Sequence, residues 1–330
     1  MSTQAPRKTE DGEPYLSVVI PVYNEEESVP RLAQALREAL ADFGETWEAV
    51  LVNDGSSDAT AERLDEEAAR DGRFVIVHLR RNFGQSAAMA AGFDEARGAV
   101  VVAMDADLQN DPRDLGKMLA KLDEGYDVVS GWRRKRQDKY LTRILPSRIA
   151  NGLISWTTGV YLHDYGCSLK AYRREVIKDV HLYGEMHRFL PALCYWAGGK
   201  IAEIEVEHHP RRFGKSKYGL SRTLRVVLDL MVVKFLVGYS TMPIRVFGPP
   251  GVASFAVGLV TAAYLAYEKL AHGASLANRP ALMLAVLLMV IGVQFISMGL
   301  LGELMARTYY ESQGRKVYSV RRIVRGVAEE

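Results

Sequence analysis

The stretch VVVAMDADLQ at residues 100–109 decides the fold, because a short apolar run leads directly into two carboxylates. The run has the length and composition of a buried strand. Asp105 and Asp107 would therefore leave the carboxyl end of that strand in a loop, separated by one residue. Paired carboxylates in such a loop suit a hard divalent cation and a diphosphate that the cation neutralises. A solvated acidic loop is the alternative, so the surrounding sequence must decide.

Similar apolar runs recur through the first part of the chain, with helical patterns between them. They cover residues 16–20, 47–52, 74–79, 100–104 and 128–130. Strands that alternate with helices predict an α/β fold with a doubly wound, mostly parallel sheet. Ligands bind beyond the carboxyl ends of such strands. We therefore expect functional residues in the loops that follow these runs.

The loops after the first two runs carry side chains suited to a nucleotide. The first run ends in Pro21-Val22-Tyr23-Asn24-Glu25, not in a G-x-G-x-x-G turn, which argues against a nicotinamide or flavin site. Tyr23 could stack on a base, and Glu25 could accept from a ribose hydroxyl or stabilise a helix N-terminus. The second run ends before Asp54, which could accept from a base N–H.

The charge balance excludes a global field for nucleic acid, since 42 Lys and Arg residues oppose 40 Asp and Glu residues. Basic residues still cluster at 133–148 and 307–325, beside apolar segments, which favours membrane lipids with anionic headgroups as partners. Cys167 and Cys194 lack metal-ligand spacing and are expected to be buried thiols. Residues 1–13 contain no signal-peptide core and are predicted to be a disordered tail in the cytosol.

Two long uncharged segments, residues 246–267 and 280–302, could each cross a bilayer as a transmembrane helix. A pair of buried core helices is the alternative. The short link between the segments and the basic flank after them predict an integral inner or plasma membrane protein with both termini cytosolic. Amphipathic patterns near 140–158 and at 220–243 predict helices that lie in the headgroup layer or pack on the domain. The predicted plan is a cytosolic domain at 14–219, an interfacial helix at 220–243, two spans within 244–305 and a basic cytosolic tail at 306–330.

The motifs at residues 19–25, 53–56, 81–84 and 105–109 together resemble the signature blocks of glycosyltransferase family 2. They are most similar to its polyprenyl-phosphate branch, which includes dolichol-phosphate mannose synthases and bactoprenol glucosyltransferases. The resemblance covers nearly the whole chain, because that branch also has interfacial helices and two C-terminal spans. It implies a GT-A catalytic domain, a nucleoside-diphosphate sugar donor and inversion at the anomeric carbon.

The resemblance also implies a metal and nucleotide site. Mg²⁺ or Mn²⁺ would be bound by Asp107 and Gln109, with Asp105 beside them. The implied nucleotide contacts are Pro21, Tyr23, Glu25, Asp54, Asp105, Ala106 and Asp107.

In this branch the acceptor is polyprenyl phosphate, which is ionised near neutral pH, so its attack needs no strong general base. The site must instead position that phosphate with cations. Arg133 follows the fifth run, and the resemblance maps Arg211 and Lys217 to phosphate contacts. A basic loop that faces solvent or lipid is the alternative for the last two.

Asp164 is expected near the acceptor, where it would orient the acceptor or a cation. The match is partial, because Ser168-Leu169-Lys170 stands where many relatives have Gly-Phe-Arg. The predicted catalytic residues are Asp107, Asp164 and Arg133.

Two other functions remain open on the sequence. A processive polysaccharide synthase would need a Gln-x-x-Arg-Trp motif and more spans, and a non-catalytic membrane partner would not need the carboxylates of residues 105–109. A UDP-sugar is the favoured donor, with GDP-mannose next. Glycines in the spans would allow close helix contacts, and the family suggests a homo-oligomer, namely a tetramer.

Overall fold

The structure, a computed structural model, describes residues 12–134, 151–152, 154–155, 158–178, 180, 182, 186–209, 244–273, 279–312 and 317–326. The chain forms two compact units, which we call the sheet unit (Met1–Leu230 with Lys316–Glu330) and the hairpin unit (Met231–Arg315). The predicted tail at 1–13 falls almost entirely outside the described residues. The same holds for most of the helix near 140–158 and for the helix at 220–243.

The sheet unit contains an eight-stranded sheet in the order β7-β5-β6-β4-β1-β2-β3-β8. β1 pairs in parallel with β2 and β4, and β2 pairs in parallel with β3. The strands are β1 Leu16–Val22, β2 Trp47–Asn53, β3 Phe74–Leu79, β4 Val100–Ala103, β5 Val128–Trp132, β6 Lys170–Arg173, β7 Ile201–Glu205 and β8 Val320–Arg325. The predicted mostly parallel α/β sheet is confirmed.

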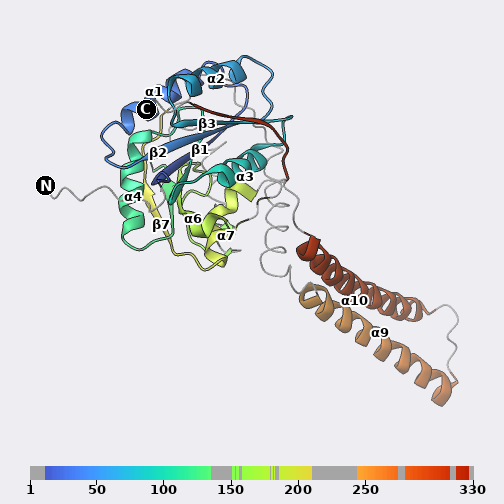
Figure 1. The fold of residues 1–330 in the computed structure, drawn as a ribbon. Coiled ribbons are helices and arrows are strands. Elements are labelled where there is room, and N and C mark those ends of the chain that lie inside the picture. The colour runs from blue at the N-terminus through green and yellow to red at the C-terminus, as the bar shows by residue number, and fades with distance from the viewer. Residues whose placement is uncertain are drawn as a thin grey trace. The chain divides into compact units, whose positions relative to one another are not determined.

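Helices cover both faces of the parallel strands, which explains why β2 and β3 are buried at every position. α1 (Val29–Ala39) and α2 (Thr60–Arg70) share one core with Val18 and Ile20 of β1. α3 (Gln85–Glu95) packs on the other face, where Gly92 lies against Val19. Figure 1 shows α1 and α2 on one side of the sheet and α3 on the other.

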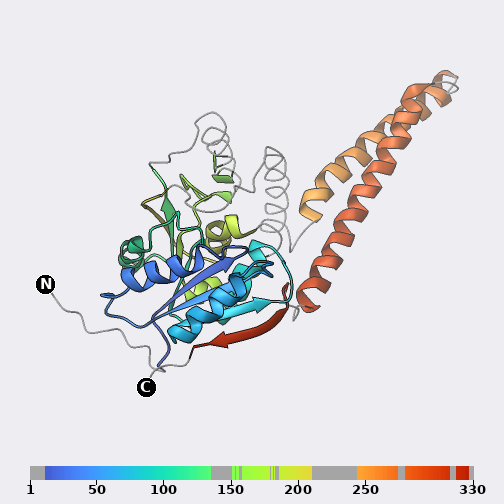
Figure 2. The same cartoon turned by 90° about the horizontal axis from the view of Figure 1, so that it is seen from above.

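Three strands, β6, β7 and β8, were not predicted. β6 and β8 pair antiparallel with their neighbours, and β7 pairs with a strand far from it in the chain. β6 pairs antiparallel with β4 and β5, and β7 pairs in parallel with β5. β8 pairs antiparallel with β3, and Figure 2 shows it along the sheet edge. β8 lies inside the region predicted as a basic tail, 306–330, so that prediction missed a strand. The basic cluster of this region predicted anionic lipid headgroups as partners, but two of its arginines form ion pairs with the sheet unit.

The other named helices in the described part of the sheet unit are short. They are η1 (Pro112–Asp114), α4 (Leu115–Asp123), α6 (Arg174–Lys178), η3 (Met186–Phe189) and α7 (Leu190–Trp196). Cys167 and Cys194 are both buried free thiols, as predicted.

The hairpin unit consists of α9 (Ile244–His272) and α10 (Pro280–Ser312). They contain two candidate membrane spans, Phe247–His272 and Pro280–Gly302, of which only 17% and 11% are buried. Helices of a soluble core would be mostly buried, so this exposure argues against that alternative. Glycines in the spans allow α9 and α10 to pack closely. A Cβ added at Gly251 or Gly292 would lie within 3.0 Å of backbone or side-chain atoms of the facing helix.

Candidate functional site

The strand order changes direction between β1 and β4. The chain proceeds from β1 to β2 and β3 on one side, then returns to β4 on the other side of β1. Ligands of open α/β sheets bind at such a topological switch point, outside the carboxyl ends of the strands. The loops after β1, β2, β3 and β4, which we call the switch-point edge, are therefore where the structure offers a ligand site.

The loop after β1 is bound to the loop after β2. Asn24 adopts φ 52° and accepts from the Ser57 backbone N–H through Oδ1 at 2.9 Å. The Glu25 N–H donates to Thr60 Oγ1 at 2.8 Å. The Glu25 carboxylate accepts from Ser28 Oγ at 2.7 Å, next to the start of α1, which agrees with a helix-stabilising role. Pro21, Tyr23 and Glu25 are all partly buried at this edge.

Asp54 holds the loop after β3. Its carboxylate accepts from the Phe83 N–H at 2.7 Å and from the Gly84 N–H at 2.9 Å. Burial raises the pKa of Asp54, and these two hydrogen bonds only partly offset that rise. Gly55 adopts φ 66°, and a Cβ there would lie 2.4 Å from the Arg81 carbonyl carbon, so only glycine fits the turn. The predicted base acceptor thus already has two backbone donors.

The two predicted metal carboxylates follow β4 directly. Gln85, the first residue of α3, donates to Asp105 Oδ1 at 2.9 Å, and Asp107 Oδ1 accepts from the Gln109 N–H at 3.2 Å. Leu108 has φ 59°, a strained conformation for a branched apolar residue that often marks a functional loop. Burial and then the Asp107 charge raise the pKa of Asp105. The loop therefore brings like charges together, which a cation would relieve.

The donor set of this loop fits a magnesium or manganese ion. Among the described residues, no three His, Cys, Asp or Glu side chains form a complete metal cage. Asp105, Asp107 and Gln109 offer oxygen ligands, and Mg²⁺ is commonly bound by one or two carboxylates together with substrate phosphates and water. The arrangement therefore suits an ion that arrives with a diphosphate.

Arg133 and Asp164 form a buried ion pair beyond β5. Arg133 Nε donates to Asp164 Oδ2 at 2.7 Å, and Nη2 donates to Oδ1 at 3.1 Å. The two side chains are 11% and 2% exposed. Burial lowers the pKa of Arg133, but Asp164 outweighs that effect and raises it overall. The structure thus brings these two predicted residues together as a bidentate pair.

Glu203 of β7 holds the turn that carries Asp164, and the sequence analysis missed it. Its carboxylate accepts from the His163 N–H, His163 Nδ1 and the Asp164 N–H at 2.7–3.1 Å. His163 also stacks on Trp132 of β5, with ring centroids 4.2 Å apart. No sequence motif links these residues, because Glu203 lies 39 positions from Asp164.

Lys170 is a second residue that sequence reasoning did not assign. It is 4% exposed, and its ammonium donates to the backbone carbonyls of Tyr165 and Cys167. Burial lowers the pKa of Lys170. Burial also raises the pKa of the Cys167 thiol to about 11, which leaves it inert near neutral pH. Lys170 therefore stabilises the turn between Asp164 and β6 through its hydrogen bonds to two backbone carbonyls.

His187 lies close to the start of α3. Ser86 Oγ and His187 Nδ1 are 2.8 Å apart, and the His187 N–H donates to the same hydroxyl at 3.3 Å. We call residues 105–109 the carboxylate loop. Since Ser86 follows Gln85, adjacent residues of one helix contact this loop and η3. Arg211 and Lys217, the two other predicted phosphate contacts, lie outside the described residues.

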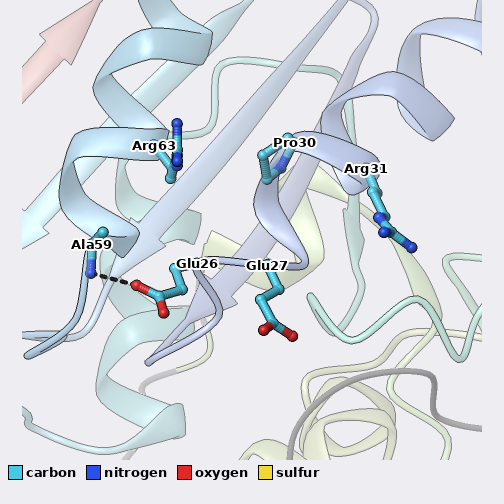
Figure 3. Close-up of a pocket in the computed structure, with 6 residues that line it drawn as sticks. All are labelled: Glu26, Glu27, Pro30, Arg31, Ala59 and Arg63. Carbon is cyan, nitrogen blue, oxygen red and sulfur yellow. Dashed lines mark hydrogen bonds between the residues drawn. The ribbon is translucent and has the colours of Figure 1, made fainter.

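Two hollows flank the switch-point edge. One, of about 400 Å³, is lined by Glu26, Glu27, Pro30, Arg31, Ala59 and Arg63. Figure 3 shows Glu26 bonded to the Ala59 N–H there, and no predicted site residue lines it. The other, of about 340 Å³, includes Leu108 and Asn110, on either side of Gln109. The second hollow is thus the one beside the carboxylate loop.

Residues 17–181 match the family model described as glycosyl transferase family 2, and residues 242–308 match the one described as GtrB C-terminal hairpin. The chain is 46% identical over 315 residues to dodecaprenyl-phosphate galacturonate synthase of Rhizobium johnstonii, covering 93% of this chain and 92% of the relative. It is 41% identical over 312 residues to undecaprenyl-phosphate 4-deoxy-4-formamido-L-arabinose transferase of Pseudomonas aeruginosa, covering 94% and 90%.

Among solved structures, glucosyl-3-phosphoglycerate synthase from Mycobacterium tuberculosis, in complex with Mn²⁺ and UDP, resembles this chain with a TM-score of 0.53. The match covers 67% of this chain and 80% of that one at 19% identity, which supports the GT-A fold. Together with the family models and the relatives, it confirms the resemblance predicted from the strand-end motifs: the chain belongs to glycosyl transferase family 2.

Proposed function

We propose that the protein transfers a sugar from a nucleoside-diphosphate sugar to polyprenyl phosphate, with inversion at the anomeric carbon. The observation that carries this proposal is the carboxylate loop at the switch point, in a chain that also has two candidate membrane spans. The two relatives reported above are named for dodecaprenyl phosphate and undecaprenyl phosphate. They align over more than nine-tenths of this chain.

The switch-point edge binds the donor. Tyr23 and Glu25 contact the base and ribose from the β1 loop, together with Pro21, and Asp54 shapes the β3 loop around the nucleotide. Asp105, Ala106 and Asp107 approach the diphosphate. Mg²⁺ or Mn²⁺, bound by Asp107 and Gln109 beside Asp105, would neutralise the charge of the leaving diphosphate.

The Arg133–Asp164 pair serves the acceptor side. The acceptor phosphate is an anion, so it attacks without giving up a proton, and the residues around it need only orient it. Asp164 already binds Arg133 through both oxygens, which suits it to orient that guanidinium rather than to act as a base. Arg211 and Lys217 add positive charge for the phosphates.

The membrane arrangement follows from the same reaction. The hairpin unit anchors the chain in the inner or plasma membrane, with the sheet unit and both termini in the cytosol, where nucleotide sugars occur. The assembly is a homo-oligomer, for which the family suggests a tetramer. The donor is a UDP-sugar, with GDP-mannose as the next choice, and the names of the relatives direct attention to a uronic acid or a modified arabinose.

The test is a donor panel. Purified full-length protein receives Mn²⁺, undecaprenyl phosphate and one of a set of UDP- and GDP-sugars, and lipid-extractable sugar is measured. We expect one donor to give product, and the same protein without Mn²⁺ to give none. A panel with no lipid-linked product from any donor would contradict the proposal.

A further inference from the structure

β8 returns from the hairpin unit to the edge of the sheet. It pairs with β3 from Val75↔Arg325 to Leu79↔Val320. The contact continues past the end of β3, because the Arg80 N–H donates to the Ser319 carbonyl at 2.9 Å. The matched model of the C-terminal hairpin ends at residue 308, before this strand begins.

β8 contacts a helix on each face of the sheet. Arg322 pairs with Asp65 of α2, and Arg325 pairs with Glu95 of α3 at 2.9 Å. Residues three apart in a strand point to opposite faces, which agrees with the placement of α2 and α3 on opposite faces. One strand thus fixes two helices that do not share a core.

The contacts to α3 gather at the C-terminal end of that helix. The Tyr318 hydroxyl donates to Asp94 at 2.5 Å, next to the Arg325–Glu95 pair. Burial, together with Asp94, raises the pKa of Tyr318, so the hydroxyl stays a donor. A guanidinium near the carboxyl end of a helix also interacts favourably with the helix dipole. The last turn of α3 is therefore held from β8.

The other end of α3 meets the carboxylate loop. Gln85 at its first position donates to Asp105 at 2.9 Å, and Ser86 contacts His187. The loop that leads into α3 is held at both of its ends. The Arg80 N–H donates to the Ser319 carbonyl before the loop, and the Gly84 N–H donates to the Asp54 carboxylate at its end. Because α3 is one uninterrupted helix of 11 residues, its placement at one end sets its placement at the other.

We propose that β8 is a positioning element for the donor site. Tyr318 and Arg325 set α3, and α3 in turn holds Gln85 against Asp105. This inference rests on the proposed function in one respect, that the switch-point edge binds the nucleotide. In the chain, residues 313–319 separate α10 from this strand.

The test uses the full-length chain in detergent and measures UDP binding by calorimetry in the presence of Mn²⁺. The double variant Tyr318→Phe with Arg325→Ala removes both contacts to α3. Arg321→Ala, at an exposed position of the same strand, is the matched control. We expect the double variant to weaken UDP binding about fivefold to tenfold, the size of effect expected from the net loss of one ordinary hydrogen bond. The control should bind UDP like the wild type, and both should melt within a few degrees of it.

A second comparison separates positioning from general loosening. In a Gln85→Ala background, the double variant should weaken UDP binding no further, because its effect passes through Gln85. Unchanged UDP binding in the double variant, equal weakening in Arg321→Ala, or additive effects with Gln85→Ala would each overturn the inference. A wild-type protein that binds neither UDP nor GDP would overturn the proposed function itself, and this inference with it.

Discussion

The two sides of the site are held together by different means. At the switch-point edge, loops that follow parallel strands are held to one another by hydrogen bonds such as those of Asn24 and Asp54 with backbone N–H groups. Beyond β5, the Arg133–Asp164 pair is buried and depends on Glu203 of a distant strand. The first side brings the like charges of Asp105 and Asp107 together, which a cation would relieve. The second side is a closed framework that already pairs its charges. The difference suggests that substitutions on the first side alter catalysis, whereas those on the second side also alter stability.

The largest effect is expected at the buried pair. Asp164→Ala leaves the Arg133 guanidinium buried without its partner, so the free energy of unfolding should fall by about 3–5 kcal/mol. The measurement is the melting temperature of the full-length protein. Asp164→Leu combined with Arg133→Met should recover most of the loss, since it removes both charges. A single variant as stable as the wild type would show that the second side is not a closed framework.

The second-largest effect is expected in the carboxylate loop, where a substitution should lower kcat and leave the free energy of unfolding unchanged. Asp107→Asn removes a metal ligand, so kcat should fall about 10²–10³-fold, as for other losses of charge stabilisation. Turnover across a Mn²⁺ titration is the measurement. Asp111→Asn, which alters the cap of η1 in the same segment, is the control and should retain turnover. Full metal-dependent activity in Asp107→Asn would exclude Asp107 as a ligand.

A smaller effect is expected at Glu203. Glu203→Gln keeps the shape but removes the charge that holds the 163–164 turn, so kcat/KM for polyprenyl phosphate should fall about tenfold, consistent with one charged hydrogen bond. UDP affinity should stay unchanged, because the switch-point edge is not involved. Glu205→Gln, which removes an exposed partner of Arg134, is the control. If UDP affinity fell together with kcat/KM, the two sides would not be separable.

The smallest effect concerns pH and a region away from both sides. Burial raises the pKa of Asp71, but hydrogen bonds from Arg73 and Arg37 outweigh it and lower the value from 3.8 to about 2. The stability from Asp71 is therefore complete above about pH 4 and is lost as pH falls towards 2. Asp71→Asn should cost about 1–2 kcal/mol at pH 6, and its melting temperature should converge with that of the wild type only as the pH falls through about 2. A pH-independent difference would argue against this ion pair.

The same contrast explains what the sequence could reveal. The loops after β1, β2 and β4 were predictable because each motif directly follows an apolar strand and is read locally. Glu203, His163 and Lys170 were not, because their roles arise from pairings between strands that are far apart in the chain. β8 was missed for a further reason: its arginines were assigned to lipid headgroups, whereas two of them pair with Asp65 and Glu95.

The most direct test of the proposed reaction is the stoichiometry of its products. With the active donor, Mn²⁺ and undecaprenyl phosphate, the nucleotide released and the mass of the lipid product are measured together. Attack by the lipid phosphate on the anomeric carbon predicts release of the nucleoside diphosphate and a lipid that carries one phosphate and the sugar. Release of the nucleoside monophosphate with a lipid diphosphate sugar, or transfer to an acceptor other than the lipid phosphate, would contradict the account.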